Sequence, residues 1–236
     1  MNATEQPTAA IERTDAPETR SHETIDRFRV GIADVDGDCV DGATLLDWIY
    51  RAAHRTAELW SGTRCVLASV GNLHLDRPIA VGECVEVRAG LVYTGRSSMH
   101  LLITVQSGDS ARGLTDQTAQ CAVIFVAVDG AGAPVEVPRW TPLTMLELQR
   151  HRQARVRARM RRRIEDAMTA HDYTQQVATR RLITTADADS DGTVPGAAVL
   201  GWIDDAACER GADWTGGRVV TSYLTAVSFH RPVRVG

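Results

Sequence analysis

Two carboxylates and one glycine in this sequence have the types and positions that acid–base chemistry on a carbonyl group needs. Asp38 lies in a loop rich in Asp and Gly, shortly before an apolar helical pattern that starts at Gly42, and Asp204 lies inside a second such pattern. A carboxylate close to a water molecule can act as a general base, most effectively where burial raises its pKa toward neutrality. The free N–H groups at a helix start can hold the negative charge that develops on an attacked carbonyl oxygen, and a glycine lets the backbone come close. An Asp before a helix is also a common turn or N-cap residue, so both roles stay open for Asp38.

The helices that carry these residues are two copies of one stretch. Shifting the sequence by 154 residues aligns Gly42–Gly82 with Gly196–Gly236 without a gap, and 15 of the 41 paired positions are identical. A shared register over this length predicts a tandem duplication of two domain-sized units. Repeat two reaches only the partner of Gly82, so the sequence predicts an incomplete second unit, either as a fragment or as a naturally short form.

The composition is that of an ordinary globular chain. Its 236 residues are 44% hydrophobic and 24% charged, with a net charge of −4 that gives no hint of a polyanionic partner. The longest apolar run, Cys121–Val128, is far too short for a membrane span, and the polar N-terminus lacks the apolar segment of a signal peptide. Five cysteines without C-x-x-C spacing argue against a disulfide framework and a zinc site, and fit a reducing cytoplasm.

The periodicity of repeat one predicts a strand, a buried helix and then four strands. Alternation of apolar and polar residues indicates strands around Phe28–Ile32, Val85–Tyr93 and Met99–Gln106. Two further strands are expected at the apolar stretch Cys65–Leu75 and at Gln117–Val128. The helix between them has apolar residues at three- and four-residue spacing, namely Leu45, Ile49, Ala52, Ala53 and Thr56. We therefore expect an α+β unit in which one antiparallel sheet wraps one long helix. Repeat two is expected to open with a strand near Gln176–Thr184.

A basic helix is predicted between the repeats. Thr144 and Glu147 have the spacing of a capping box. Eight arginines follow: Arg150, Arg152, Arg155, Arg157, Arg159, Arg161, Arg162 and Arg163. They fit a surface that binds nucleic acid or phosphate, but the absence of aromatic residues between the arginines favours a solvated linker helix. The predicted organisation is a disordered tail over residues 1–22, a first domain over 23–140, a linker helix over 141–172 and a second domain over 173–236.

Four segments together resemble the acyl-CoA thioesterases of the hot-dog fold, in particular the cytosolic long-chain acyl-CoA hydrolases with two hot-dog units in one chain. They are Gly37-Asp38-Cys39-Val40-Asp41-Gly42 before the first helix, Trp202-Ile203-Asp204-Asp205-Ala206-Ala207 in the second, Gly95-Arg96-Ser97-Ser98-Met99 at a strand start, and Phe125-Val126-Ala127-Val128-Asp129 with Pro134 and Val137-Pro138 at a strand end. The resemblance covers about residues 24–236. It implies hydrolysis of acyl-CoA to a free fatty acid and coenzyme A.

The resemblance also assigns roles. Family enzymes place a helix carboxylate of one unit near the helix start of the other, so Asp204 is expected to be the base or nucleophile, Asp38 to orient water or substrate, and amides near Gly42 to polarise the carbonyl. Repeat one has Tyr50 where repeat two has Asp204, and repeat two has Gly192 where repeat one has Asp38. We therefore predict one working site and one inactive site. Arg96, Ser97 and Ser98 are expected to contact coenzyme A.

Two other readings remain from the residues alone. One is a catalytically inactive protein of the same fold that binds acyl-CoA or coenzyme A, and the other, weaker one is hydration of enoyl thioesters. No G-x-S-x-G occurs, which speaks against an α/β-hydrolase esterase. We expect no metal and no cofactor, since coenzyme A is part of the substrate. The other expectations are a homo-oligomer in the cytoplasm, with neither nucleic acid nor membrane as a partner.

Overall fold

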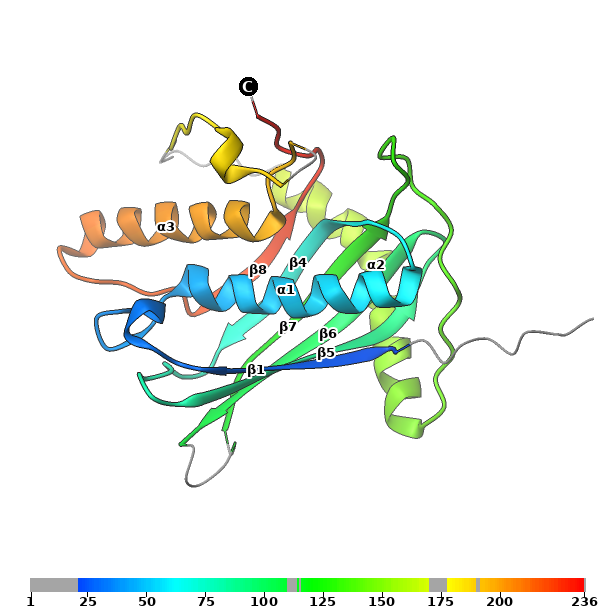
Figure 1. The fold of residues 1–236 in the computed structure, drawn as a ribbon, viewed down its shortest axis with the longest axis horizontal. Coiled ribbons are helices and arrows are strands. Elements are labelled where there is room, and N and C mark those ends of the chain that lie inside the picture. The colour runs from blue at the N-terminus through cyan, green and yellow to red at the C-terminus, as the bar shows by residue number, and fades with distance from the viewer. Residues whose placement is uncertain (1–20, 110–113, 115, 170–177, 190–191, 236) are drawn as a thin grey trace, which may run out of the picture.

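One antiparallel sheet wraps a long helix in the computed structural model, which describes residues 21–109, 114, 116–169, 178–189 and 192–235 (Figure 1). Within these residues the sheet has the strand order β1-β5-β6-β7-β4-β8. The strands are β1 (Glu23–Arg29), β4 (Cys65–Leu75), β5 (Cys84–Thr94), β6 (Ser98–Gly108), β7 (Asp116–Ala127) and β8 (Tyr223–Ser228). The short strands β2 (Val35–Asp36) and β3 (Cys39–Val40) form a separate hairpin before the first helix. The predicted α+β hot-dog architecture is confirmed.

Helix α1 (Gly42–Ser61) supplies the centre of the core. It begins at the N-cap Asp41, whose Oδ2 accepts a hydrogen bond from Thr44 N at 3.2 Å, and it ends at Gly62 in the left-handed conformation. The predicted apolar face is buried against the sheet, and Ala52 and Ala53 are fully buried. Small side chains there allow the sheet to approach the helix closely, because no long side chain holds the two backbones apart.

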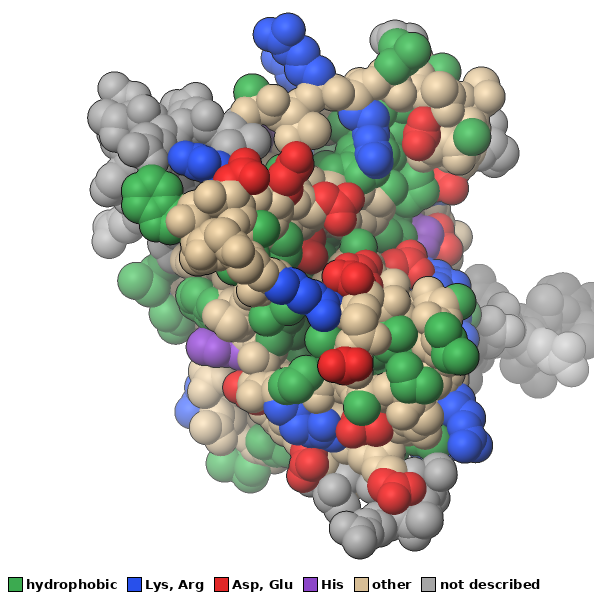
Figure 2. Space-filling model, turned by 90° about the vertical axis from the view of Figure 1, so that its left-hand side faces the viewer, with side chains coloured by type: hydrophobic (Ala, Val, Ile, Leu, Met, Phe, Trp, Pro, Cys, Tyr) green, Lys and Arg blue, Asp and Glu red, His purple; other side chains and the backbone are tan. Residues whose placement is uncertain are grey.

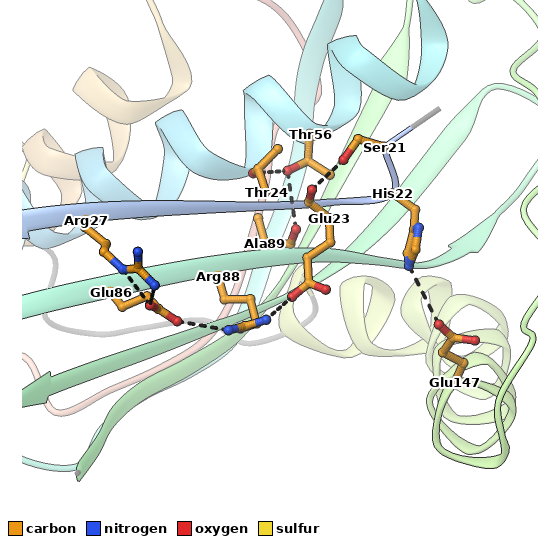
Figure 3. A network of polar contacts seen from close by, with 10 residues as sticks. All are labelled: Ser21, His22, Glu23, Thr24, Arg27, Thr56, Glu86, Arg88, Ala89 and Glu147. Atoms are coloured by element: carbon orange, nitrogen blue, oxygen red, sulfur yellow. Dashed lines mark hydrogen bonds and ion pairs between the residues drawn. The ribbon is translucent and has the colours of Figure 1, made fainter. Parts of the chain in front are cut away.

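Buried polar contacts fix the strand β1 to the helix and to its neighbour β5 (Figure 3). The hydroxyls of Thr24 and Thr56 lie 2.6 Å apart, and Thr56 Oγ1 also donates to the carbonyl of Ala52 at 2.9 Å. On the other face of β1 the buried carboxylate of Glu86 accepts from Arg27 and Arg88. A buried charge requires such partners, since water is excluded from it.

Helix α2 (Met145–Thr169) lies on the opposite face of the sheet from α1 (Figure 1). The predicted capping box is confirmed, because Glu147 N donates to Thr144 Oγ1 at 3.2 Å while Thr144 N donates to Glu147 Oε2 at 2.9 Å. Ala154 on this helix is buried, and His151 Nδ1 lies 3.2 Å from the carbonyl oxygen of Val92 on β5. The helix therefore packs on the first domain.

The second repeat contributes helix α3 (Gly196–Thr215) and strand β8. Helix α3 lies beside α1 and runs antiparallel to it, and β8 adds to the sheet by pairing with β4 (Figure 1). The prediction of a strand near Gln176–Thr184 is wrong for residues 178–184, the part of this segment that the structure describes, because they form no strand. In repeat one the matching strand β1 is held by its pairing with β5, and a strand forms only where it has such a hydrogen-bonding neighbour.

Several expectations concern the ends of the chain and its thiols. Residues 1–20 of the predicted tail lie outside the described residues. All five cysteines are free thiols, as the sequence led us to expect. Among the described helices, none is both long and apolar enough to cross a membrane.

Candidate active site

The start of α1 and the middle of α3 meet at Gly42 and Asp204. Asp204 is buried on α3, and a β-carbon built at Gly42 would overlap its carboxylate. One turn earlier on α3, a β-carbon at Gly201 would lie 3.2 Å from the side chain of Ala43. Glycines on both helices therefore bring the two backbones together, and the structure brings Asp204 to the start of α1 as the repeats predict.

The first turn of α1 presents backbone donors toward this carboxylate. Asp41 caps Thr44 N, whereas within the described part of the chain no group accepts from the N–H groups of Gly42 and Ala43. Unsatisfied N–H groups at a helix start carry the positive end of the helix dipole. Such donors are suited to an oxygen atom that gains negative charge during a reaction.

Thr221 is the polar partner of Asp204. It lies in the segment between α3 and β8, and its hydroxyl donates a hydrogen bond to Asp204 Oδ1. Burial raises the pKa of Asp204 above its ordinary value; the hydrogen bond from Thr221 opposes this shift, and the charges of Asp41 and Asp205 add to it. A carboxyl group with a raised pKa is a better proton acceptor than an exposed one, provided that it is ionised.

A cavity of about 510 Å³ opens in front of this pair, which we call the Asp204 cavity. Residues of both repeats line it, among them Gly42, Leu45 and Ile79 from the first and Asp204, Cys208 and Thr221 from the second. Its rim is strongly acidic. The charged groups at the rim are Asp36, Asp41, Asp76, Asp205 and Glu209 against Arg77 and Arg218. Figure 2 views this end of the molecule, and acidic side chains gather in the middle of the face.

Asp38 does not belong to this cavity. It lies exposed in the turn between β2 and β3, and the lining of the Asp204 cavity includes its neighbours Asp36 and Asp41 instead. Asp41 rather than Asp38 acts electrostatically on Asp204. The expected pairing of Asp38 with Asp204 is therefore not found, because the tight hairpin turns residue 38 toward solvent.

Arg96, Ser97 and Ser98 lie at the other end of the sheet. Ser98 begins β6 and pairs with Val126 near the end of β7, whereas Gly42 lies at the end of the sheet marked by Leu75. None of the three residues lines the Asp204 cavity. Their expected contact with coenzyme A stays a prediction, and the geometry does not connect it with Asp204.

A second cavity of about 520 Å³ lies at the start of α3 and surrounds Tyr50, the counterpart of Asp204. We call it the Tyr50 cavity. Burial raises the pKa of Tyr50 to about 12, with a further contribution from the charge of Asp189. Leu67 occupies the place that Thr221 has in the other cavity, as the shift of 154 residues requires. Gly192, the expected partner of Tyr50, is not in its lining.

Sequence reasoning missed Thr221 and Asp189. The internal alignment pairs Thr221 with Leu67, and the same shift of 154 residues, continued before Gly196, pairs Asp189 with Val35. At both positions one copy has a polar residue and the other has an apolar residue, and this difference could have identified them.

Comparisons with known proteins agree with the geometry. The family model "Thioesterase superfamily" matches residues 40–113. The cytosolic acyl coenzyme A thioester hydrolase of Mus musculus is 26% identical over 227 residues, which cover 86% of this chain and 58% of that protein. The solved structure of an acyl-CoA hydrolase from Bacillus cereus matches with a TM-score of 0.59 and 30% identity, over 63% of this chain and 93% of that one. An apo-hexameric acyl-CoA thioesterase matches with a TM-score of 0.59 and 27% identity, over 61% of this chain and 93% of that one. The chain thus spans little more than half the length of the mouse relative.

Proposed function

Because this chain belongs to the acyl-CoA thioesterases of the thioesterase superfamily, we propose that it hydrolyses acyl-CoA thioesters to free fatty acids and coenzyme A in the Asp204 cavity. One observation carries the assignment to this cavity. The buried carboxylate of Asp204 lies against the start of α1, where Gly42 allows close approach and two backbone N–H groups have no acceptor among the described residues.

In the proposed reaction Asp204 is the general base and the start of α1 binds the carbonyl oxygen. The ionised Asp204 removes a proton from a water molecule whose oxygen attacks the thioester carbon. The N–H groups of Gly42 and Ala43 donate to the oxyanion that forms. The carbon–sulfur bond then breaks, and the thiolate takes the proton from Asp204 and leaves as the thiol of coenzyme A. Thr221 holds the carboxylate in place through its hydrogen bond.

Direct attack by Asp204 on the thioester is the other route that this geometry allows. On this second route Asp204 displaces the thiolate of coenzyme A and forms a mixed anhydride, and water that attacks the Asp204 carbon of this anhydride leaves its oxygen in Asp204. In a single turnover in ¹⁸O-labelled water, the general-base route puts the label into the fatty acid and leaves Asp204 unlabelled. Label in the Asp204 carboxylate, read by mass spectrometry of its peptide, would establish the covalent route.

The partners and the setting are part of the same proposal. We infer that the chain forms a homo-oligomer, which the hexameric solved structure supports. A location in the cytoplasm is supported by the cytosolic relative. The substrate is an acyl-CoA, and the apolar residues Leu45 and Ile79 offer a wall for the acyl chain in the Asp204 cavity.

The test is thioester hydrolysis by the purified chain, on short, medium and long acyl-CoAs, beside the variant Asp204→Asn. We expect release of the thiol from the wild-type protein and a loss of about 100-fold or more in kcat for the variant, which is the range typical of a missing general base. A folded wild-type protein that binds acyl-CoA but releases no thiol would support the inactive binding protein instead. Unchanged hydrolysis by Asp204→Asn would remove the assignment to this cavity.

A further inference from the structure

The Tyr50 cavity is as large as the Asp204 cavity but lies at the other end of the helix pair. The two volumes are about 520 and 510 Å³. One cavity opens at the start of α1 and the other at the start of α3, and these antiparallel helices lie side by side (Figure 1). The molecule therefore has a second space that could hold a ligand of similar size.

The Tyr50 cavity lacks the groups that hydrolysis would use. Tyr50 stands in the position of Asp204, and with a pKa of about 12 it stays neutral at physiological pH and is no base. The ring of Tyr50 lies against the start of α3, since a β-carbon at Gly196 would lie 3.2 Å from it. Asp189 is the nearby carboxylate, but it is exposed and lies in a loop, whereas Asp204 is buried on a helix.

The rim of this cavity has the opposite charge character from the rim of the Asp204 cavity. Arg64, Arg231 and Arg234 line it together with His54 and His230, against the two carboxylates of Glu58 and Asp189. Arg231 and Arg234 are exposed, lie on the segment that follows β8 and are part of the lining of the cavity. Guanidinium groups are the preferred partners of phosphate and carboxylate oxygens.

Apolar side chains form the rest of the wall. Leu67 and Val66 come from β4, Val199 from α3, and Phe229 and Val233 from the segment after β8. A cavity that combines cations at its mouth with an apolar wall fits an anionic ligand that has an apolar tail.

We propose that the Tyr50 cavity is a second, non-hydrolytic binding site for an anionic ligand with an apolar chain, namely acyl-CoA or the fatty acid released from it. Its ligand class rests on the proposed function, but its geometry does not depend on Asp204. One chain then carries a hydrolytic site with an acidic rim and a binding site with a basic rim. Ligand in the second site is placed to act on the first, since α1 and α3 each contribute to both cavities.

The test is the number of binding sites per chain for a thioether analogue of a long-chain acyl-CoA, which cannot be hydrolysed, measured by titration calorimetry. We expect two binding events per chain in the wild-type protein and in Asp204→Asn. The double variant Arg231→Glu/Arg234→Glu should weaken one of them by about tenfold or more, which corresponds to about 1.4 kcal/mol. Both residues are exposed, so the fold should tolerate the changes.

Two control variants separate the local effect from net charge. Arg152→Glu/Arg155→Glu reverses two exposed arginines on α2 and changes the net charge equally, and it should leave both binding events intact. Arg231→Lys/Arg234→Lys keeps the charge and should retain most of the affinity. Competition with coenzyme A alone or with a free fatty acid then identifies whether the rim binds phosphate or carboxylate.

The outcomes separate this inference from the proposed function. A single binding event in the wild-type protein would overturn the second site. Two events whose affinities are the same in Arg231→Glu/Arg234→Glu would also overturn it, and neither result would affect Asp204-dependent hydrolysis. If Arg231→Glu/Arg234→Glu abolishes one binding event but leaves thiol release at low substrate concentration unchanged, the second site is supported. If hydrolysis is absent but the arginine-dependent event is present, the proposed function fails and the second site remains.

Discussion

Gly42 and Asp204 stand 162 positions apart in the sequence, yet the carboxylate of Asp204 occupies the space that a side chain at residue 42 would fill. One residue belongs to each repeat. Neither repeat alone has both the buried carboxylate and the helix start that faces it, so the candidate site exists only because α1 and α3 pack together. The contact also explains why this position requires glycine although its backbone has no special conformation.

The variant Gly42→Ala tests this contact. The added methyl group would displace the carboxylate of Asp204, and a displacement of about 1 Å can lower a rate roughly 100-fold. We expect a loss of that order in kcat, measured by thiol release. Gly90→Ala is the matched control, because a β-carbon at Gly90 on β5 would meet nothing within 4 Å. Equal activity of the two variants would show that Asp204 acts without close approach to α1.

The variant Thr221→Val tests the hydrogen bond to Asp204. Because this bond lowers the pKa of Asp204, its loss should raise that pKa further. A general base must be ionised, so the acidic limb of the profile of kcat/KM against pH should move to higher pH. Thr221→Ser keeps the hydroxyl and should keep the limb in place. An unmoved limb in Thr221→Val would mean that another group controls it.

The acidic rim of the Asp204 cavity should repel the phosphates of coenzyme A. Asp205 and Glu209 are exposed at this rim and are therefore subject to screening by salt, with a Debye length of about 10 Å at 0.1 M. We expect the KM for acyl-CoA to fall as salt is added. The double variant Asp205→Asn/Glu209→Gln should lower the KM at low salt and reduce its dependence on salt. A KM that rises with salt would instead indicate that cations dominate substrate binding.

The buried pair of hydroxyls at Thr24 and Thr56 should matter for stability. Thr56→Val leaves the hydroxyl of Thr24 with only the carbonyl of Ala52, at 3.2 Å, which should cost about 1–2 kcal/mol in the free energy of unfolding. The double variant Thr24→Val/Thr56→Val removes both groups, so its cost should be less than the sum of the single changes. Urea unfolding measures all three. Additive costs would mean that the two hydroxyls do not depend on each other.

Most of the architecture could be predicted from the sequence because its signals are local and strong. The apolar period of α1 is followed by Gly62 at its end, and along much of the long strands buried residues recur at alternate positions. The strand expected at Gln176–Thr184 failed for a non-local reason. A strand needs a hydrogen-bonding neighbour, and the neighbour is set by the rest of the sheet rather than by the residues themselves.

Only part of the candidate site could be predicted, because some of its contacts are set by distant parts of the chain. The repeat and the family resemblance together identified Asp204, where the two copies differ, and Gly42, which both copies share. Spacing alone could not decide which of the four carboxylates in the loop before α1 faces the site, and the hairpin of β2 and β3 leaves Asp38 exposed while Asp41 caps α1. The residues next to Thr221 give no sign of its role, because it reaches Asp204 only after the chain reverses at the end of α3, and only the difference from Leu67 in the other copy marks it.

The ionised carboxylate of Asp204 should lower the stability of the folded protein at neutral pH. Its pKa is raised in the folded state above the ordinary value of 3.8, chiefly by burial. The carboxyl group therefore stabilises the fold fully below its unfolded pKa, and this contribution is lost as the pH rises through the higher, folded pKa. Asp204→Asn stays neutral and can still accept the hydrogen bond from Thr221. It should have a higher melting temperature than the wild-type protein at pH 7, and the difference should shrink below pH 3.8. A variant that is less stable at pH 7 would show that the ionised carboxylate is well compensated, which would remove the physical reason for treating Asp204 as a strained and reactive base.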